Sequence, residues 1–397
     1  MQFLFGYGYT KGTTPYYYER AFRKLGKTIT CGPSTSKDKR QGIPCGINAD
    51  IQKITHSIQP DCFILFPEGN FFLPQNIEKI TVPKILILSD SFINLHWHKH
   101  YAQLFDFVFV AQKGYVSQLK KLGIKNTYWL PNACDPEIHQ DLHLERIYDI
   151  GFVGTLNTLH NPRRSLYIKI LSKHFKSQIT SNIWYKEISK IYSQSRIAFN
   201  ICGAQDLNMR VFETMATGSM LLTDYIPHGL LDLFKDRHHL VTYHSPQEAA
   251  SLIRYYLTHE DKRIKIAQRG QKEVLDKHTY LHRAQVIISK IKDAKGRTAR
   301  AGKPSSNLLL AKTYFYINHP QLEKRLLQLT KELSVSIIEL PKTEKFKLKI
   351  IGFLTIRIRP SRRRIIIAII KKLEKQRVLE LCKWCYYQML LQTSLNA

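Results

Sequence analysis

The first 292 residues alternate short apolar runs with longer stretches whose apolar positions recur at helical spacing. Short runs bounded by polar or turn residues are typical of buried strands, and spacings of three and four are typical of helices that pack one face on a sheet. The alternation predicts an α/β protein with parallel sheets. The predicted strands are 1–5, 61–66, 84–89, 105–111, 126–130, 148–154, 196–200, 220–224 and 239–243, and the predicted helices include 16–25, 114–122, 164–174, 247–258 and 261–275.

Two segments of different composition divide this pattern. The polar loop 131–146 follows the first five strands and carries two prolines, and "KDAKGRTARAGKPSSN" at 292–307 is rich in glycine, serine, proline and cations. Beyond it, helical patterns flank a segment that alternates cations with apolar residues. We therefore predict a first domain at 1–135, a linker at 136–147, a second domain at 148–292, a flexible tether at 293–307 and a basic α/β extension at 308–397.

Charge is concentrated in the extension. Of the net charge of +29, residues 294–397 hold 22 Lys and Arg against 6 Asp and Glu, a net of +16, which leaves +13 for the rest. Such asymmetry favours an anionic partner for the tail, either a membrane surface or a nucleic acid. A small packed module that joins subunits is an alternative interpretation of the same residues.

The remaining composition favours a cytoplasmic protein. No apolar run reaches the roughly 18 residues of a spanning helix, and "MQFLFGYGYT" reads as a first strand because it has no basic leader and no cleavage site. The seven cysteines are scattered without the spacing of a disulfide framework, which is typical of reduced thiols. Cys382 and Cys385 form a lone "CKWC" with no second pair, so we favour a helix with aromatic residues over a metal site there.

Candidate chemistry in parallel sheets is expected where strands end, because ligands bind beyond the carboxyl ends of the strands. The first strand runs into "GYGYTKGTTP", where Gly8 and Gly12 allow a tight turn and close backbone approach before a helix N-terminus that favours anions. This is neither a Walker loop nor a complete dinucleotide fingerprint. A plain surface loop is the alternative.

Acids and histidines follow two further strands. Glu68 stands in "FPEGN", and Asp90 and His96 stand in "LSDSFINLHWHKH". Its three histidines are spaced by two, which does not suit metal ligands on one helix face, so we predict no metal site. Asp90 or His96 is the predicted general base for a hydroxyl acceptor. Solvated loop residues that cap the next helix are the alternative, since Asp and Ser are good caps.

Arginines follow the first strand of the second domain. In "GFVGTLNTLHNPRR", Gly154 and Thr155 stand in a loop, and Arg163 and Arg164 fall in the first turn of a helix, where the helix dipole disfavours cations. A pyrophosphate bound between the domains would explain them, because arginine forks and a helix N-terminus both bind such an anion. Exposed arginines on a basic protein are the alternative.

The stretch "NMRVFETMATGSMLLTD", 208–224, repeats that arrangement. Arg210 lies in the first turn of the predicted helix, and Glu213 lies on an apolar stripe. Both placements are unfavourable unless a ligand compensates for them. Asn208 stands at the start of this helix.

Residues 149–289 resemble the nucleotide-binding half of GT-B glycosyltransferases, specifically the group-1 domain of CgeB-like proteins, which are related to glycosyltransferase family 4. The matching pieces are "IGFVGT", "SRIAFNI", "NMRVFETMATGSMLLTD" and "GQKEVLDKHTYLHRA", and "PNACD" stands where related families carry Pro-Asn-Gly-Val-Asp. The resemblance covers about 1–292. It implies two Rossmann-like domains that face across a cleft, and transfer of a sugar from a nucleotide-sugar, most simply a UDP-sugar, to a hydroxyl of a glycan, glycolipid or protein.

The resemblance also implies roles for single residues. Glu213 would bind the ribose hydroxyls, and Asn208 and Arg210 would lie near the diphosphate, without a metal or other cofactor. Two departures matter: Gln205, with Asp206 beside it, stands where family 4 has an acid, and Thr155 and His160 stand where it has arginine and lysine. The retaining mechanism is therefore not carried over.

Two functions remain open at this point. The first is a cytoplasmic glycosyltransferase whose basic tail attaches to the inner face of a membrane, because cations beside "IIGFLTI" and "IIIAII" suit an anionic interface. The second is a nucleic-acid-binding protein on an inactive GT-B scaffold, although the tail has no aromatic-interleaved RNA motif.

Overall fold

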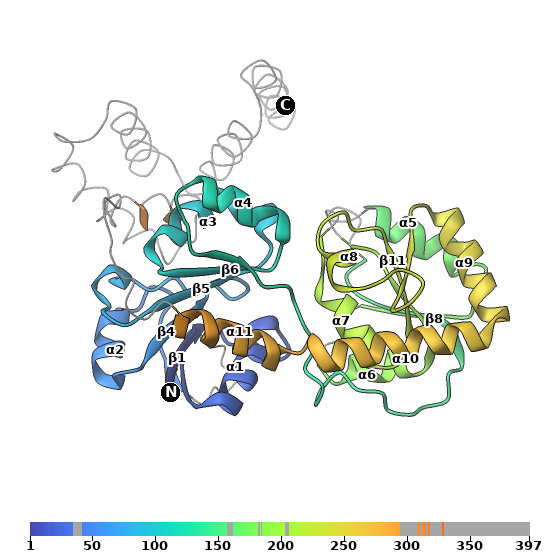
Figure 1. Ribbon diagram of the computed structural model, residues 1–397, viewed down its shortest axis with the longest axis horizontal. Coiled ribbons are helices and arrows are strands. Elements are labelled where there is room, and N and C mark those ends of the chain that lie inside the picture. Colours follow the sequence, from blue (N-terminus) through green and yellow to red (C-terminus); the bar gives the residue numbers. More distant parts are fainter. Residues whose placement is uncertain are drawn as a thin grey trace, which may run out of the picture. The chain divides into compact units, whose positions relative to one another are not determined.

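The computed structural model describes residues 1–34, 42–156, 162–181, 183, 185–202, 206–293, 309–310, 313–314, 317 and 328. Contacts divide the chain into two units, one of Met1–Phe92 and Asp106–Thr298, the other of Ile93–Phe105 and Ala299–Ala397. The first unit holds two sheets (Figure 1). The predicted tether lies almost wholly outside the described residues, and so does the extension apart from six single positions.

The first sheet has seven parallel strands in the order β3-β2-β1-β4-β5-β6-β7. The order reverses between β1 and β4, which is the point where such sheets bind ligands. The strands are β1 (Gln2–Tyr7), β2 (Lys27–Gly32), β3 (Ile43–Pro44), β4 (Cys62–Phe66), β5 (Lys84–Leu88), β6 (Phe107–Val110) and β7 (Thr127–Trp129). The helices are α1 (Thr14–Leu25), α2 (Ile51–Ile58), α3 (Ser91–Tyr101) and α4 (Lys113–Lys121), with single 3-10 turns at Ile77–Lys79 and Ala102–Leu104.

The second sheet has five parallel strands in the order β12-β11-β10-β8-β9, with its reversal between β8 and β10. The strands are β8 (Tyr148–Val153), β9 (Ser177–Thr180), β10 (Ser195–Asn200), β11 (Met220–Asp224) and β12 (Val241–Tyr243). The helices are α5 (Pro162–Leu171), α6 (Glu187–Ser193), α7 (Met209–Ala216), α8 (Leu230–Leu233), α9 (Pro246–Thr258), α10 (Glu260–Lys277) and α11 (Tyr280–Asp293). The predicted α/β class with parallel sheets is confirmed.

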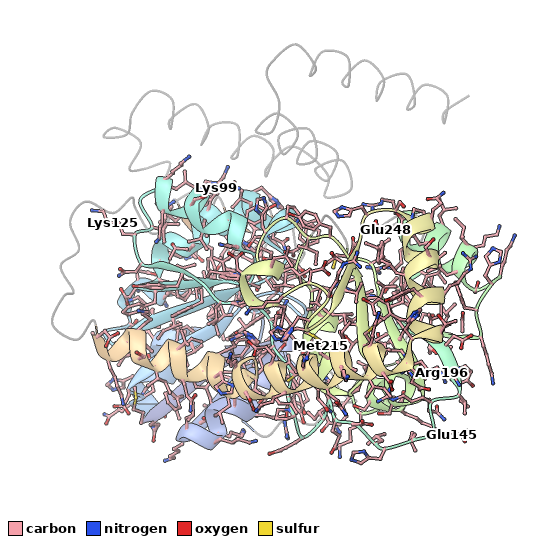
Figure 2. The ribbon with its side chains drawn as sticks, turned by 45° about the vertical axis from the view of Figure 1, so that its right-hand side comes forward. Lys99, Lys125, Glu145, Arg196, Met215 and Glu248 are labelled. Atoms are coloured by element: carbon pink, nitrogen blue, oxygen red, sulfur yellow. The ribbon has the colours of Figure 1, made fainter. Side chains whose placement is uncertain are left out.

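Helix α7 is fixed by its apolar face. Val211, Phe212 and Met215 are buried together with Leu221 of β11 and Val274 of α10. Figure 2 shows Met215 beside α10, which packs along α7. Because this packing fixes the rotation of α7 about its axis, it also fixes where Arg210 and Glu213 point.

Helix α11 shares the core of the first sheet. Its Tyr280, Ala284, Ile287 and Ile291 are buried in the cluster that contains Phe3, Phe5 and the apolar face of α1. If the domains simply followed the order of the chain, α11 would pack with the rest of 148–292. Instead it packs on the first sheet. An apolar face packs where matching apolar surface is available, and here the chain crosses back to reach it.

The chain passes from one sheet to the other twice, near Cys134 and near Tyr280, and these two segments are hydrogen-bonded to each other. Cys134 accepts a hydrogen bond from the Tyr280 N–H at 2.9 Å and donates its own N–H to His278. The buried Arg283 donates through Nε to the Pro131 carbonyl oxygen at 2.9 Å and through Nη2 to that of Asn132. Hydrogen bonds therefore hold the two segments that join the sheets together.

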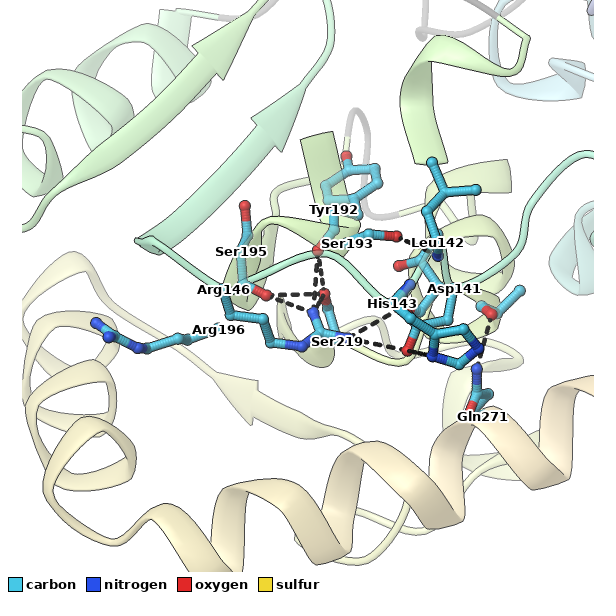
Figure 3. Close-up of polar contacts among 12 residues, drawn as sticks. Asp141, Leu142, His143, Arg146, Tyr192, Ser193, Ser195, Arg196, Ser219 and Gln271 are labelled. Atoms are coloured by element: carbon cyan, nitrogen blue, oxygen red, sulfur yellow. Dashed lines mark hydrogen bonds and ion pairs between the residues drawn. The ribbon is translucent and has the colours of Figure 1, made fainter. Parts of the chain in front are cut away.

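The predicted linker is anchored to the second sheet through Arg146 (Figure 3). Its Nη1 donates to Ser219 Oγ and to the Ser195 carbonyl oxygen, each at 2.7 Å, and its Nη2 donates to Asp141 Oδ2 at 3.3 Å. The Leu142 N–H donates to the hydroxyl of Ser193 on α6. These bonds hold the linker along α6, on its way to β8.

Within the described part of the chain, no helix has the length and apolar content needed to cross a bilayer.

Candidate active site

A cavity of about 680 Å³ lies where both sheets reverse their strand order. Its wall includes the loops after β1, β4 and β5 of the first sheet, and the end of β8 and the start of α7 from the second. The residues that line it include Gly8, Gly12, Glu68, Asp90, Gly154, Thr155, Arg164, Asp206, Asn208, Arg210 and Glu213.

The loop after β1 comes close to the loop after β4. Gly8 and Asn70 form an antiparallel bridge, and a Cβ on Gly8 would lie 1.6 Å from the Asn70 carbonyl oxygen. Gly12 has φ +79°, which favours glycine. These glycines let the loop turn sharply before α1, and at both positions the cavity wall carries no side chain.

Arg164 and Arg210, the arginine pair, come from different helices and meet at the end of β8. Arg210 Nη1 donates to the Val153 carbonyl oxygen at 3.1 Å, and Arg164 Nη1 donates to that of Thr155 at 2.9 Å. Both guanidinium groups lie over the ring of Phe152, at 5.2 and 5.8 Å from its centre. Gly154 makes the room, since a Cβ there would lie 2.4 Å from Arg210 Nη1.

The arginine pair carries two like charges in a partly buried place. Burial, followed by the charge of Arg210, lowers the pKa of Arg164 to about 10. An anion bound in the cavity would relieve both effects. Neutral ligands would not.

The N-terminus of α7 adds to this attraction. Asn208 is the N-cap residue, yet its side chain makes no capping bond and instead pairs with the amide of Asn200. The first N–H groups of α7 therefore keep the partial positive charge of a helix start at the cavity wall. The arginine pair and this helix start together favour a phosphate or diphosphate.

Glu213 lies one turn into α7 and is 3% exposed. Burial raises its pKa to about 7, against the lowering effect of Arg210. Its Oε1 lies 3.5 Å from Nε2 of the buried His139 in the linker. A buried carboxylate at a cavity wall is suited to accept hydrogen bonds from ligand hydroxyls, which would replace the water that it has lost.

Glu68, Asp90 and Asp206, the acidic cluster, line another part of the cavity. Burial raises the pKa of all three, to about 7 for Asp206, and the charge of Asp90 raises the pKa of the other two. Glu68 accepts a hydrogen bond from the Ser89 N–H at 2.9 Å. Asp90 has φ +48°, a strained conformation for a residue with a side chain. Carboxyl groups with raised pKa values can act as proton acceptors near neutral pH.

The structure brings together most of the residues predicted from the sequence. Asp90 and all the predicted binding residues except Arg163 line the cavity. Arg163 lies over the ring of Tyr167 at 5.7 Å, and its bond to that residue raises its pKa. His96 is not among the lining residues and lies in the segment Ile93–Phe105, which groups with the second unit. His160 and Gln205 lie outside the described residues.

Two functional features were missed in the sequence. The role of Asp206 in an acidic cluster depends on Asp90, which lies far away in the chain. His139 ends the motif "PNACDPEIH", whose spacing of four from Asp135 was the available signal. Within the described ranges, no three His, Cys, Asp or Glu residues are grouped so as to hold a metal ion. Independence from metal stays a prediction.

Comparison with known proteins agrees with this geometry. Residues 152–289 match the glycosyl transferase-like family. No curated protein matches the chain in sequence. This family match contains the arginine pair, Asn208 and Glu213.

Similar solved structures are GT-B glycosyltransferases. They include a glycosyltransferase from Rickettsia africae ESF-5, 10% identical with a TM-score of 0.55, over 75% of this chain and 99% of that one. Anabaena Alr3699/HepE in complex with UDP and glucose is 11% identical with a TM-score of 0.55, over 74% and 100%. Sucrose-phosphate synthase from Thermosynechococcus elongatus is 8% identical with a TM-score of 0.56, over 75% and 100%. The GT-B fold expected from the sequence is confirmed.

Proposed function

We propose that this GT-B protein transfers a sugar from a nucleotide-sugar donor to a hydroxyl of an acceptor. The observation that carries the proposal is the convergence of Arg164, Arg210 and the start of α7 on one cavity wall, with Glu213 one helical turn further in. This arrangement fits a diphosphate beside a ribose. The family match over 152–289 supports it.

Each group then has a role in the transfer. The arginine pair and the N–H groups of α7 hold the diphosphate and stabilise the negative charge that develops as it leaves the sugar. Glu213 accepts hydrogen bonds from the ribose hydroxyls. Asn208 shapes the start of α7, and the backbone around Gly8, Gly12, Gly154 and Thr155 borders the donor.

On the acceptor side, we propose Asp90 as the general base. It follows β5, lines the cavity and has a pKa raised by burial, so it can take a proton from an acceptor hydroxyl near neutral pH. Asp206 and Glu68 belong to the same acidic cluster and place further carboxyl groups near Asp90. His96, the other candidate from the sequence, is not given a role.

Several finer proposals accompany this function. UDP is the proposed nucleotide, since HepE in the comparison binds UDP and glucose. Membership of the CgeB-like group rests on the motifs quoted above. A cytoplasmic location, and attachment of 308–397 to an anionic membrane that carries a glycolipid acceptor, rest on composition and charge.

A thermal-shift screen tests the donor. The full chain is melted with UDP, GDP, ADP and TDP and with their glucose conjugates, alongside Glu213→Gln. A ligand at one hundred times its Kd stabilises the fold by about 2.7 kcal/mol. We expect UDP and UDP-sugars to raise the Tm of the wild type, and Glu213→Gln to lose most of that shift while it melts normally without ligand. No shift with any nucleotide would reject the proposed function.

A further inference from the structure

His139 occupies an unusual place in the molecule. It lies in the predicted linker, between the two sheets, and is fully buried. A tight turn holds it, because the backbone N–H of His139 donates to the Asp135 carbonyl oxygen at 2.7 Å. Arg20 of α1 in turn bonds the Asp135 carboxylate through Nε. The backbone of the linker at His139 is therefore held in place.

The structure fixes the position of the imidazole proton. Nδ1 of His139 accepts a hydrogen bond from the Asp135 N–H at 3.0 Å, so this nitrogen carries no proton. A neutral ring must then carry its proton on Nε2, and it cannot become an imidazolium without breaking that bond. Burial acts in the same direction and lowers the pKa of His139 to about 3.

Nε2 of His139 lies near the carboxylate of Glu213. Nε2 lies 3.5 Å from Glu213 Oε1, and among the residues that the structure describes it has no closer hydrogen-bond partner. The edge-on contact with Tyr17, at 5.0 Å between ring centres, holds the imidazole plane in place. A small movement of the carboxylate closes this separation to an ordinary hydrogen bond of about 2.9 Å.

We propose that His139 is a positioning residue for the donor site, whose Nε2–H holds one oxygen of Glu213 so that the other faces the ribose. The inference rests on the proposed function. It explains why a neutral histidine is buried against a carboxylate, and it places a residue of the interdomain linker in the donor site.

Among the groups around Glu213, the carboxyl of Glu213 itself is the one whose ionisation should change with pH near 7. Arg210 on the same helix lowers the pKa of Glu213. The other facing groups are neutral at pH 7, because burial raises the pKa of each of them: Tyr17 of α1, Tyr192 of α6, Tyr280 of α11 and Cys134, whose pKa is raised to about 12. Since the carboxylate accepts the ribose hydroxyls, nucleotide affinity should rise as pH increases through about 7.

The first experiment is calorimetric titration of the full chain with UDP between pH 5.5 and 8.5, for the wild type, His139→Gln, His139→Asn and Tyr17→Phe. Glutamine can place an N–H near Nε2 and keep the donor to Glu213. Asparagine can keep the acceptor for the Asp135 N–H but cannot reach Glu213. Glu213→Gln gives the baseline, since the UDP phosphate titrates near pH 6 by itself.

We expect His139→Gln and Tyr17→Phe to keep the wild-type midpoint and bind UDP within about threefold. His139→Asn should shift the midpoint to higher pH and bind UDP about tenfold more weakly at pH 7, because the carboxylate loses a donor to its charged form. Equal weakening by both His139 variants, with an unchanged midpoint, would show a purely structural role and overturn the proposal.

The second experiment needs no ligand. In a spectrum of ¹⁵N-histidine-labelled wild type, His139 should be neutral and protonated on Nε2 from pH 5.5 to 8.5, and Glu213→Gln should shift its Nε2 signal. His139→Gln assigns the signal. A proton on Nδ1, or no response to Glu213→Gln, would overturn the proposal. If UDP and all other nucleotides fail to bind while the spectrum is as expected, only the proposed function fails.

Discussion

The arginine pair and the acidic cluster lie on the same cavity but are built differently. Arg164 and Arg210 are held by strand-end carbonyl oxygens and by one shared ring, all within the second sheet and its helices. The acidic cluster combines two segments of the first sheet with Asp206 from the second. The proposed donor side is thus a preorganised part of one sheet, whereas the proposed acceptor side depends on both sheets.

The sharpest test of this comparison is Asp90→Asn, for which we expect kcat to fall about 10³-fold while the Kd for UDP is unchanged. The proposed base acts on the acceptor, so its loss should leave donor binding unchanged. The measurement is the release of UDP from the donor found in the screen, together with titration of UDP. Asp206→Asn is the matched variant, and a larger loss there than in Asp90→Asn would move the base to Asp206.

Removing one arginine should weaken donor binding directly. Arg210→Met is expected to raise the Kd for UDP about 10²-fold, because a charged group that bonds the diphosphate is lost. The matched control is Arg163→Met, which removes the same charge from α5 outside the cavity and should bind UDP within twofold of wild type. Similar losses in both variants would mean that overall charge, and not the arginine pair, attracts the nucleotide.

A smaller effect is expected from the glycine that makes room for Arg210. Gly154→Ala puts a Cβ 2.4 Å from Arg210 Nη1, so the guanidinium must leave its place at the Val153 carbonyl oxygen. At a φ of 159° a residue with a Cβ is strained, so alanine should lower the Tm and also weaken UDP binding about fivefold to tenfold. Gly114→Ala, where the nearest atom is 3.8 Å away, should have no effect on the Kd. Unchanged UDP binding in Gly154→Ala would contradict the role of this space.

Much of the fold follows from local pattern. All nine predicted strands are present, because each is a short run rich in apolar residues and bounded by polar or turn residues. The missed strands are β2, β3 and β9, and each has a weaker signal: β2 has only two apolar residues among six, β3 has two residues in all, and β9 is four half-buried residues. Helix α11 has a clear apolar face, but chain order alone does not show which sheet that face contacts.

The candidate site was predictable to the extent that strand ends carry it. Gly154, Arg164 and Glu213 stand in positions where their residue types need an explanation, so single positions were enough to select them. The shared ring of Phe152 and the bond between Asp135 and His139 are relations between residues, and they exist only once the chain has folded.

The packing of α11 on the first sheet has a practical consequence for splitting the protein. A fragment of residues 148–292 would expose the apolar side chains of α11 to water, where they favour aggregation. These side chains are Tyr280, Ala284, Ile287 and Ile291. A fragment that ends near Thr279 keeps the second sheet without that surface. The first sheet, expressed alone, would need α11 supplied as a separate peptide. The two pieces can therefore serve as a complementation pair, and their reassembly would measure how strongly α11 binds the first sheet.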